Sequence, residues 1–494
     1  MKKQFFKISI AAALVGLAPS CTKFVDYNPK EDYEITADDY FKSPADYEKM
    51  VIGTYSPLQW LWATTVIGDV ASDNAVTGGE NATDVLGLQQ IDDYTITTNN
   101  SYLQEIWSAC YEGINRANYL EENKAKLDFA GKDNLYGQAY FLRAYYYFEL
   151  VKFFGDVPLF VDKRLSASDS KTLTRTAKAD VYKQIELDLT NAIAALPTTQ
   201  AEQGRITKYA AQALLGKVYL YQNKFAEAAS MLDNVVAGPF TLVNDFQSIW
   251  LASGENGPES VFEIQYTNLE PFYDWTNPGR GQGNLAVQSA GIRNLTGGSP
   301  YAQGWSTNLP TQDLAAAYDA GDKRKAATIL DIEAYKTANP QFNITYMVAP
   351  YKNTGLYNQK YHPRKGETSG QVELNYLNNF RTIRFADVLL MAAEAYNRKP
   401  SPDDAKAQQY LNRVRARAFG DQNHNVTATG TALTDAIWEE RRLELGMEGH
   451  RFFDLVRTGK AAQTIEGFVA GKNEVFPIPQ LEVDISGLEQ NKGY

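Results

Sequence analysis

The chain has 494 residues, of which 44% are hydrophobic, and it carries a formal net charge of −11. Binding to phosphate backbones requires a basic surface, so a chain with this charge is not expected to bind nucleic acid. Two cysteines cannot supply a disulfide framework for this length, and the fold must be stabilised by a large hydrophobic core.

The first 20 residues have the pattern of a signal peptide. Three lysines precede an apolar run that ends at Ala18 and is too short to span a bilayer. Cys21 stands where a bacterial lipoprotein signal is cleaved and its thiol acylated, although Ala18 replaces the usual leucine three residues earlier. We therefore expect residues 1–20 to be removed and Cys21 to carry the lipid, which leaves Cys110 without a disulfide partner. The alternative is a secreted protein whose Cys21 is unmodified.

Helical periodicity dominates both ends of the mature chain. Apolar residues recur at intervals of three and four, for example at Leu135, Ala139, Leu142 and Tyr146. Helical segments are predicted near residues 105–125, 133–153, 178–196, 205–236, 381–397, 403–418 and 432–457. We find no linker rich in Pro, Ser or Gly between them, so residues 21–494 are expected to form one domain.

The segment 213–229 has the alternation of small and large residues found in tetratricopeptide helix pairs. Small side chains such as Gly216 and Ala228 allow two helices to approach closely, while Tyr219 fills the space between them. A second pair of this type is predicted over residues 384–418. The segments together predict a mainly α fold in which three to four helix pairs stack into a superhelix.

Residues 237–380 differ from these flanks, because helical periodicity mostly vanishes and Gly, Pro, Asn and aromatic residues dominate. Val261–Tyr266 alternates apolar and polar residues and is the best strand candidate. Two regions rich in aromatic residues are predicted to be long loops, one from Tyr55 to Asn74 and the other from Phe272 to Trp305. Long loops within a compact fold are uncommon and often functional.

The C-terminal part of the chain carries three motifs. Residues 436–459 read AIWEERRLELGMEGHRFFDLVRTG, residues 476–479 read FPIP, and residues 490–494 read QNKGY. In this order they resemble the C-terminal signature of the SusD/RagB family, the outer-membrane lipoproteins that capture nutrients in Bacteroidetes. The start of the mature chain, CTKFVDYNP at residues 21–29, and the helix pair over residues 384–418 are similar to that family as well.

The first motif is predicted to form an amphipathic helix that continues to residue 457. An apolar stripe facing the core is predicted at Trp438, Leu445, Phe452 and Val456. Oppositely charged residues three apart are expected to pair along the rim of the helix, namely Glu439 with Arg442 and Arg441 with Glu444. These charges and His450 are interpreted as scaffold rather than as catalytic groups.

The resemblance implies a SusD-like fold in which helix pairs at about residues 40–236 and 381–494 carry an inserted subdomain. That subdomain, at about residues 237–380, is expected to be rich in loops, to contain a few short strands and to bind the ligand. Tetratricopeptide scaffolds present surfaces rather than chemistry, so the contacts are expected on the supported loops.

A sugar presents an apolar C–H face and a rim of hydroxyl groups, which flat aromatic rings and Asp, Asn or Arg side chains can recognise. No family motif transfers individual contact positions to this chain. For each residue the alternative is packing in the core of the subdomain or contact with a transporter. The candidate contacts are Trp60, Trp62, Asp73, Asn74, Tyr273, Trp275, Arg280, Tyr301 and Trp305.

The resemblance implies a lipoprotein on the outer face of the outer membrane that binds oligosaccharide and delivers it to a TonB-dependent, SusC-like transporter. A peptide-binding, RagB-like lipoprotein would use the same scaffold and is one alternative. A surface glycoside hydrolase is another, because the sequence cannot show which of its 59 acidic residues lie close together. We expect no catalysis and no cofactor.

No metal site is expected, since the three histidines lack the spacing of metal ligands. Calcium is compatible with the family, although the chain has no Asp-rich loop with EF-hand spacing.

Overall fold

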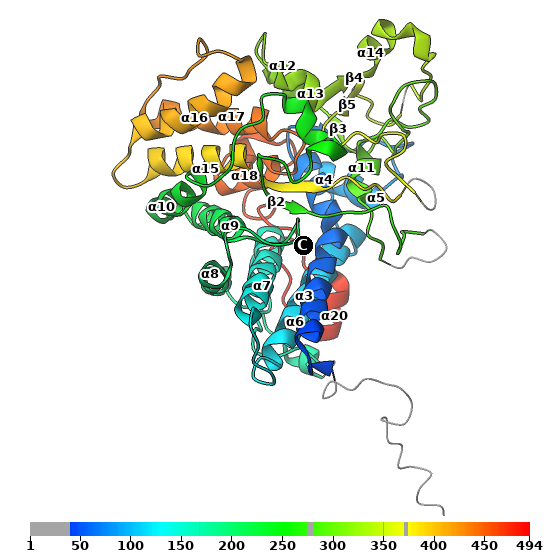
Figure 1. The fold of residues 1–494 in the computed structure, drawn as a ribbon. Coiled ribbons are helices and arrows are strands. Elements are labelled where there is room, and N and C mark those ends of the chain that lie inside the picture. The colour runs from blue at the N-terminus through cyan, green and yellow to red at the C-terminus, as the bar shows by residue number, and fades with distance from the viewer. Residues whose placement is uncertain (1–39, 167, 275–279, 349, 370–373) are drawn as a thin grey trace, which may run out of the picture.

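The computed structural model describes residues 40–166, 168–274, 280–348, 350–369 and 374–494, and its fold is mainly α, as predicted. Long helices occupy the left and lower parts of Figure 1, and short helices and strands lie at the upper right. No helix of these ranges is both long and apolar enough to cross a membrane. The long helices are α3 (Pro44–Tyr55), α6 (Ser101–Glu122), α7 (Lys132–Phe154), α8 (Lys178–Ala195), α9 (Lys208–Tyr221), α10 (Phe225–Val236), α15 (Phe385–Arg398), α16 (Asp404–Phe419) and α17 (Gly430–Glu444).

From α6 to α10, and then through α15, α16 and α17, each long helix packs on the next one along the chain. Helix α10 packs directly on α15, so the helix stack continues in space across the inserted residues between them. The close approach of neighbouring helices depends on small residues, as predicted for Gly216. A Cβ atom at this position of α9 would lie 2.6 Å from the Leu232 side chain of α10. The stacked helix pairs inferred from the sequence are therefore confirmed.

Within the described chain the strands form three two-stranded antiparallel sheets, which join segments distant in sequence. Strand β1 (Ala75–Val76) pairs with β3 (Leu309–Pro310), and β4 (Ile329–Asp331) pairs with β5 (Leu356–Asn358). The predicted strand is confirmed as β2 (Ser260–Ile264).

Strand β2 pairs with β6 (Phe380–Arg384), with Ile264 opposite Phe380. Residues 381–384 were predicted to be the start of a helix, and that part of the prediction is wrong. The ladder with β2 uses the backbone groups of this segment, so α15 begins only at Phe385.

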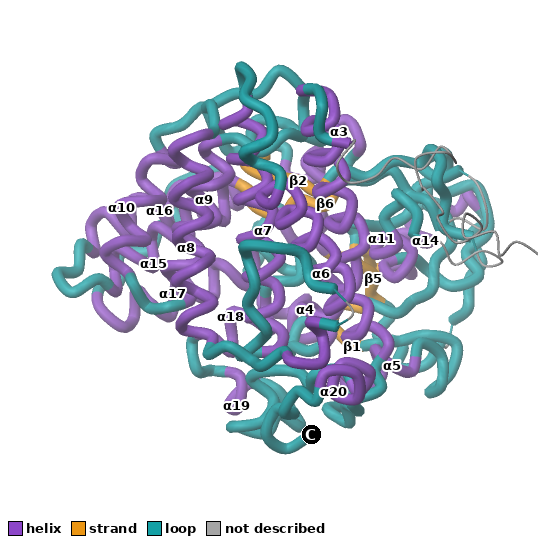
Figure 2. Tube along the Cα trace, turned by 90° about the horizontal axis from the view of Figure 1, so that it is seen from below, coloured by secondary structure: helices purple, strands orange, loops and turns teal. Residues whose placement is uncertain are grey.

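The inserted region contains short helices and a hydrophobic cluster of its own. Its helices are α11 (Leu285–Ala290), α12 (Gln312–Ala317), α13 (Arg324–Thr328) and α14 (Ile332–Ala338). Buried side chains of the cluster include Ile292, Leu309 and Tyr357. Seen from below in Figure 2, this region lies beside α5 (Leu86–Asp92), with much of its length in loops.

The first predicted loop, from Tyr55 to Asn74, is mostly helical. It contains the 3-10 helix η4 (Ser56–Leu61) and the helix α4 (Trp62–Val70). The loop prediction was wrong because Val66, Ile67 and Val70 of α4 are buried in the main core and hold the segment in a regular conformation.

The helix predicted for the first C-terminal motif is interrupted. Helix α17 ends at Glu444, and α18 (Arg451–Arg457) begins after a turn in which Met447 and Gly449 have φ angles of 65° and 76°. A Cβ atom at Gly449 would lie 2.7 Å from the Cα atom of Thr65, so this turn needs a glycine for close contact with α4. The predicted apolar stripe is also broken, because Trp438 is only half-buried.

The charges of this motif do not line an exposed rim. Glu439 and Arg442 approach to 3.9 Å as predicted, but Arg441 pairs with Asp387 instead of Glu444. Glu444 is buried and receives ion pairs from Arg384 at 2.9 Å and from other arginines. The pairing predicted for Arg441 with Glu444 is therefore wrong.

We call the surrounding set of buried charges the ionic cluster. Arg384 of β6 reaches Glu259 at 2.6 Å and Glu448 at 2.7 Å, and Arg324 of α13 reaches Glu440 of α17 at 2.6 Å. All its side chains are buried, and together they tie the insertion to the helix stack. The members of the ionic cluster are Glu259, Arg324, Arg384, Arg417, Glu440, Glu444 and Glu448.

Candidate ligand-binding site

A cavity of about 620 Å³ opens where the insertion meets the helix stack. Its walls come from η4 and the start of α4, the start of α6, the loop before α11, and the segment after α11. We call it the aromatic cavity, because five aromatic side chains of the described chain line it, namely Trp60, Trp62, Tyr102, Tyr273 and Trp305. Its volume falls within the range of roughly 300–1,000 Å³ found for sites that bind small ligands.

The first wall is fixed by the start of α6. Asn100 caps this helix by accepting a hydrogen bond from the backbone N–H of Tyr102 at 3.1 Å, and its Nδ2 donates to the carbonyl of Gly87 at 2.8 Å. The ring of Tyr102 meets the Trp62 ring edge-on, with centroids 5.8 Å apart. A Cβ atom at Gly87 would lie 2.7 Å from the Tyr102 ring, so a glycine is required there.

The opposite wall is held by side chain to backbone hydrogen bonds. Asn375, which is fully buried, accepts from the N–H of Tyr273 at 2.7 Å and donates to the Tyr273 carbonyl at 3.1 Å. Arg293 donates through Nε to the carbonyl of Trp305 at 3.2 Å. The rings of Tyr273 and Trp305 are half-buried, and the backbone that carries each ring is held by these hydrogen bonds. The cavity therefore keeps its shape without a ligand.

Two arginines and three carboxylates also line the cavity. Arg293 is paired with Asp84, and Asp84 also accepts from the N–H of Glu80 at 2.9 Å. Desolvation by the cavity walls raises the pKa of Glu105 above its ordinary value, although Arg280 acts to lower it. Burial likewise raises the pKa values of Tyr102 and Tyr273, so their hydroxyl groups are neutral donors and acceptors at physiological pH.

The predicted ligand contacts are not all in one place. Trp60, Trp62, Tyr273, Arg280 and Trp305 line the aromatic cavity together, although they come from segments separated in sequence. Trp275 and the predicted lipidation site Cys21 lie outside the described residues. Whether the five grouped residues bind a ligand remains a prediction.

Asp73 and Asn74 lie elsewhere, where arginines of the C-terminal motif engage them. Asp73 forms a bidentate pair with Arg451, at 2.7 and 2.9 Å, and lines a second cavity of about 540 Å³. Asn74 is 0% exposed and accepts from Nε of Arg442 at 2.9 Å. The polar groups of both residues therefore stabilise the junction between α4 and the C-terminal motif.

Tyr301 is also placed away from the aromatic cavity, in the hydrophobic cluster of the insertion. It is 6% exposed, its ring packs on His362 with centroids 4.7 Å apart, and its hydroxyl accepts from Gln359 at 2.9 Å. Tyr301 therefore follows the alternative given for the candidate contacts, because it packs in the core of the subdomain.

Several lining residues were missed by the analysis of the sequence, among them Tyr102, Glu105, Asp84, Asp274 and Arg293. Tyr102 and Glu105 are three apart, so they share one face of α6. That spacing could have grouped them, but the sequence does not say which face of the helix looks into a cavity.

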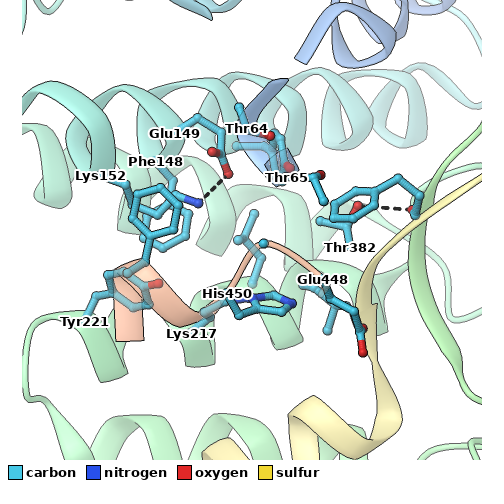
Figure 3. Close-up of a pocket in the computed structure, with 16 residues that line it drawn as sticks. Thr64, Thr65, Phe148, Glu149, Lys152, Lys217, Tyr221, Thr382, Glu448 and His450 are labelled. Atoms are coloured by element: carbon cyan, nitrogen blue, oxygen red, sulfur yellow. Dashed lines mark hydrogen bonds and ion pairs between the residues drawn. The ribbon is translucent and has the colours of Figure 1, made fainter. Parts of the chain in front are cut away.

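A further cavity, of about 40 Å³, lies inside the helix stack. Figure 3 shows His450 and Lys217 on one side of it and Glu149, paired with Lys152 at 2.8 Å, on the other. Burial lowers the pKa of His450 well below its ordinary value, which keeps the imidazole neutral. A space of this size accommodates water rather than a sugar ring, so it is not the ligand site.

No group of three or more His, Cys, Asp or Glu side chains within the described ranges is arranged to hold a metal ion.

Comparison with known proteins identifies the family. Residues 258–475 match the SusD family, and residues 23–220 match a family described as starch-binding and associating with the outer membrane. SusD-like protein P2 of Formosa agariphila is 28% identical over 93% of this chain and 94% of its own length.

Solved structures agree with this assignment. A laminarin-binding SusD-like protein superimposes with a TM-score of 0.83 and is 34% identical over 92% of this chain and 100% of its own. Surface glycan-binding protein A from Bacteroides thetaiotaomicron, solved in complex with laminarihexaose, gives a TM-score of 0.79 and 26% identity over 91% of this chain and 99% of its own. The helix stack, the inserted region and both halves of the sequence thus lead to one conclusion, that this chain belongs to the SusD family.

Proposed function

We propose that this protein is a cell-surface lipoprotein that captures a neutral β-glucan of the laminarin type in its aromatic cavity. Lipid on Cys21 would anchor it to the outer membrane, and a TonB-dependent, SusC-like transporter would receive the bound oligosaccharide. The observation that carries the proposal is the grouping of five aromatic side chains around one preformed cavity.

The shape and chemistry of this cavity support a sugar ligand. Aromatic rings offer flat faces for the C–H side of a pyranose ring, and Glu105, Ser101 and Arg280 offer acceptors and donors for its hydroxyl groups. Contacts of this kind are individually weak, which permits release to a transporter. The likeness to a laminarin-binding protein and to a protein solved with laminarihexaose makes β-glucan the ligand class to test first.

The charges of the cavity support a neutral rather than an anionic glycan. Carboxylates outnumber guanidinium groups among the lining residues, since Asp84, Glu105 and Asp274 face two arginines. The charge of Arg293 is balanced by Asp84 and by Glu80 at 3.5 Å. A sulfated or uronic acid-containing chain would therefore meet no net positive field.

Binding without catalysis is also part of the proposal. A glycosidase needs one carboxyl group that can transfer a proton and a second that can act as base or nucleophile. Asp84, one of the three lining carboxylates, is paired with Arg293 and accepts a hydrogen bond from the N–H of Glu80, so its oxygens are engaged within the protein.

The proposal is tested with residues 22–494, which is the mature protein without the lipidated Cys21, by titration calorimetry against laminarihexaose, other neutral and anionic oligosaccharides, and a peptide set. Saturable binding of neutral glucan without release of reducing sugar is the expected result. Affinity for peptides alone would instead indicate a RagB-like function, and reducing-sugar release would indicate a hydrolase.

A further inference from the structure

The indole of Trp60 is contacted by two guanidinium groups. The Cζ atom of Arg280 lies 4.2 Å from the ring centroid, and that of Arg116 lies 5.2 Å from it. Arg280 lines the aromatic cavity and Arg116 does not, so Arg280 is the cation on the cavity side of the ring. Any ligand that approaches Trp60 therefore meets the Arg280 guanidinium as well.

Both arginines are connected to one carboxylate on α6. Arg116 binds Oε1 of Glu112 at 2.7 Å, and Arg280 approaches Oε2 of the same group at 3.7 Å. Arg116 also donates to the carbonyl of Gly53 at 2.5 Å, which ties this group to α3. Glu112 itself is not a lining residue of the cavity, so its effect on a ligand would be indirect.

The backbone that follows Arg280 is held by hydrogen bonds at Gln282, but the side chain of Arg280 is not buried. The N–H of Thr267 donates to the carbonyl of Gln282 at 3.1 Å, and the N–H of Gln282 donates to the carbonyl of Pro271 at 3.1 Å. The Arg280 side chain is 41% exposed. Among the described residues, the Glu112 carboxylate and the Trp60 ring are the side-chain contacts from which we infer its direction.

We propose that Glu112 is a positioning residue of the glycan site, which holds Arg280 over Trp60 so that the ring and the guanidinium act as one recognition surface. The stacked guanidinium directs its N–H groups toward the hydroxyl rim of a sugar bound in the cavity. This inference rests on the proposed function, because the ligand is taken to be a neutral glycan.

A double-mutant cycle tests whether Glu112 acts through Arg280. The Kd for laminarihexaose is measured for the wild type, Glu112→Gln, Arg280→Ala and the double variant. Glu112→Gln should weaken binding about threefold when Arg280 is present and should have no further effect when Arg280 is absent, as expected for coupled neighbours. Additive effects of the two changes, or an unchanged Kd in Glu112→Gln, would overturn the proposal.

The matched control is Glu122→Gln on the same helix. Glu122 pairs with Arg164 at 3.0 Å and lies outside the aromatic cavity, so this change should leave the Kd at the wild-type value. A similar loss of affinity in both variants would mean that the helix as a whole is perturbed and would refute a specific role for Glu112.

A second measurement is made without ligand and separates this inference from the proposed function. The emission of Trp60, obtained by subtracting the spectrum of Trp60→Phe, is quenched with acrylamide. Glu112→Gln should increase quenching, because Arg280 would no longer cover the ring steadily. Unchanged quenching would contradict the positioning role, whereas absence of glycan binding by the wild type would contradict only the proposed function.

Discussion

The aromatic cavity and the ionic cluster both gather charged residues from distant segments, but their relation to water is opposite. In the ionic cluster, Arg384 and Glu444 are at most 1% exposed and are paired at 2.9 Å. At the aromatic cavity, the lining residue Arg280 is paired with Glu112, which is outside the lining; both side chains are 41% exposed and they are 3.7 Å apart. In a buried, closely paired cluster, the donors and acceptors of the charged groups are engaged within the protein. In an exposed pair at longer distance, some of these donors and acceptors remain free to bind a ligand.

If the aromatic cavity is the ligand site, as we propose, charge density is a poor guide to function in this protein. The C-terminal motif contributes Glu440, Glu444 and Glu448 to the ionic cluster, and their arginine partners join the insertion to the helix stack. All lining residues of the aromatic cavity, including its five aromatic side chains, are outside that motif. A functional site in a binding protein of this kind is marked by rings and polar groups that remain accessible.

The largest expected effect is on stability, in the ionic cluster. Replacing Arg384 with methionine leaves Glu259, Glu444 and Glu448 without their shared partner, and this should lower the free energy of unfolding by roughly 3–5 kcal/mol. Urea unfolding of the mature protein measures the change. Lys183→Met, which removes an exposed pair with Asp180, is the control and should change stability by less than about 1 kcal/mol. A loss of similar size in both variants would show that burial of the ionic cluster adds no stability beyond that of an exposed pair.

The next effect is on glycan affinity, in the aromatic cavity. Replacing Trp305 with alanine should weaken laminarihexaose binding by about 2 kcal/mol, or roughly thirtyfold in Kd, because a stacking face is lost. Calorimetric titration provides the Kd. Trp438→Phe changes a half-buried tryptophan outside this cavity and should bind as the wild type does. Equal affinities of Trp305→Ala and the wild type would remove this ring from the site.

A smaller effect concerns the pH dependence of stability and involves Asp69, a buried residue of α4. Desolvation raises the pKa of Asp69 to about 7, although hydrogen bonds from Asn308 and Gly449 act to lower it. A carboxyl group with a raised folded pKa stabilises the fold at low pH, and that contribution is lost as the pH rises toward 7. Between pH 5 and 6 the wild type should lose about 1 kcal/mol relative to Asp69→Asn.

This difference is measured by urea unfolding of both proteins at the two pH values. Asparagine should be accommodated, because its amide can donate to Oδ1 of Asn308, a buried oxygen for which the described residues provide no partner. Parallel pH dependences of the two proteins would show that Asp69 is ionised throughout this range.

The smallest expected effect is that of metal removal. Dialysis against EDTA should change the Kd for laminarihexaose by less than about twofold, since the lining carboxylate of Asp84 is already paired with Arg293. Loss of binding that calcium restores would instead place a metal in the site.

The long helices could be predicted from the sequence because apolar periodicity directly reflects burial on one face. The same periodicity failed in the C-terminal motif, where the turn at Met447 and Gly449 interrupts the helix. It also missed α4, because residues 55–74 were judged by their aromatic and acidic side chains rather than by Val66 and Val70. Local pattern alone does not show that a motif rich in charges will be buried by segments far away in sequence.

The candidate site was partly accessible to sequence reasoning. Aromatic residues near Gly and Pro singled out Trp60, Tyr273 and Trp305, which the fold brings to one cavity. The same criterion selected Tyr301, which packs in the insertion instead. Residue type indicates what could bind a sugar, but only the tertiary contacts decide which rings face a cavity.

The central claim is that the glycan binds in the aromatic cavity, and a crystal structure of the mature protein with laminarihexaose tests it most directly. Our account predicts a glucosyl ring against Trp305, with the Arg280 guanidinium that is stacked on Trp60 within hydrogen-bonding distance of a hydroxyl group. Sugar bound in the cavity beside Asp73, or nowhere on the protein, would contradict it.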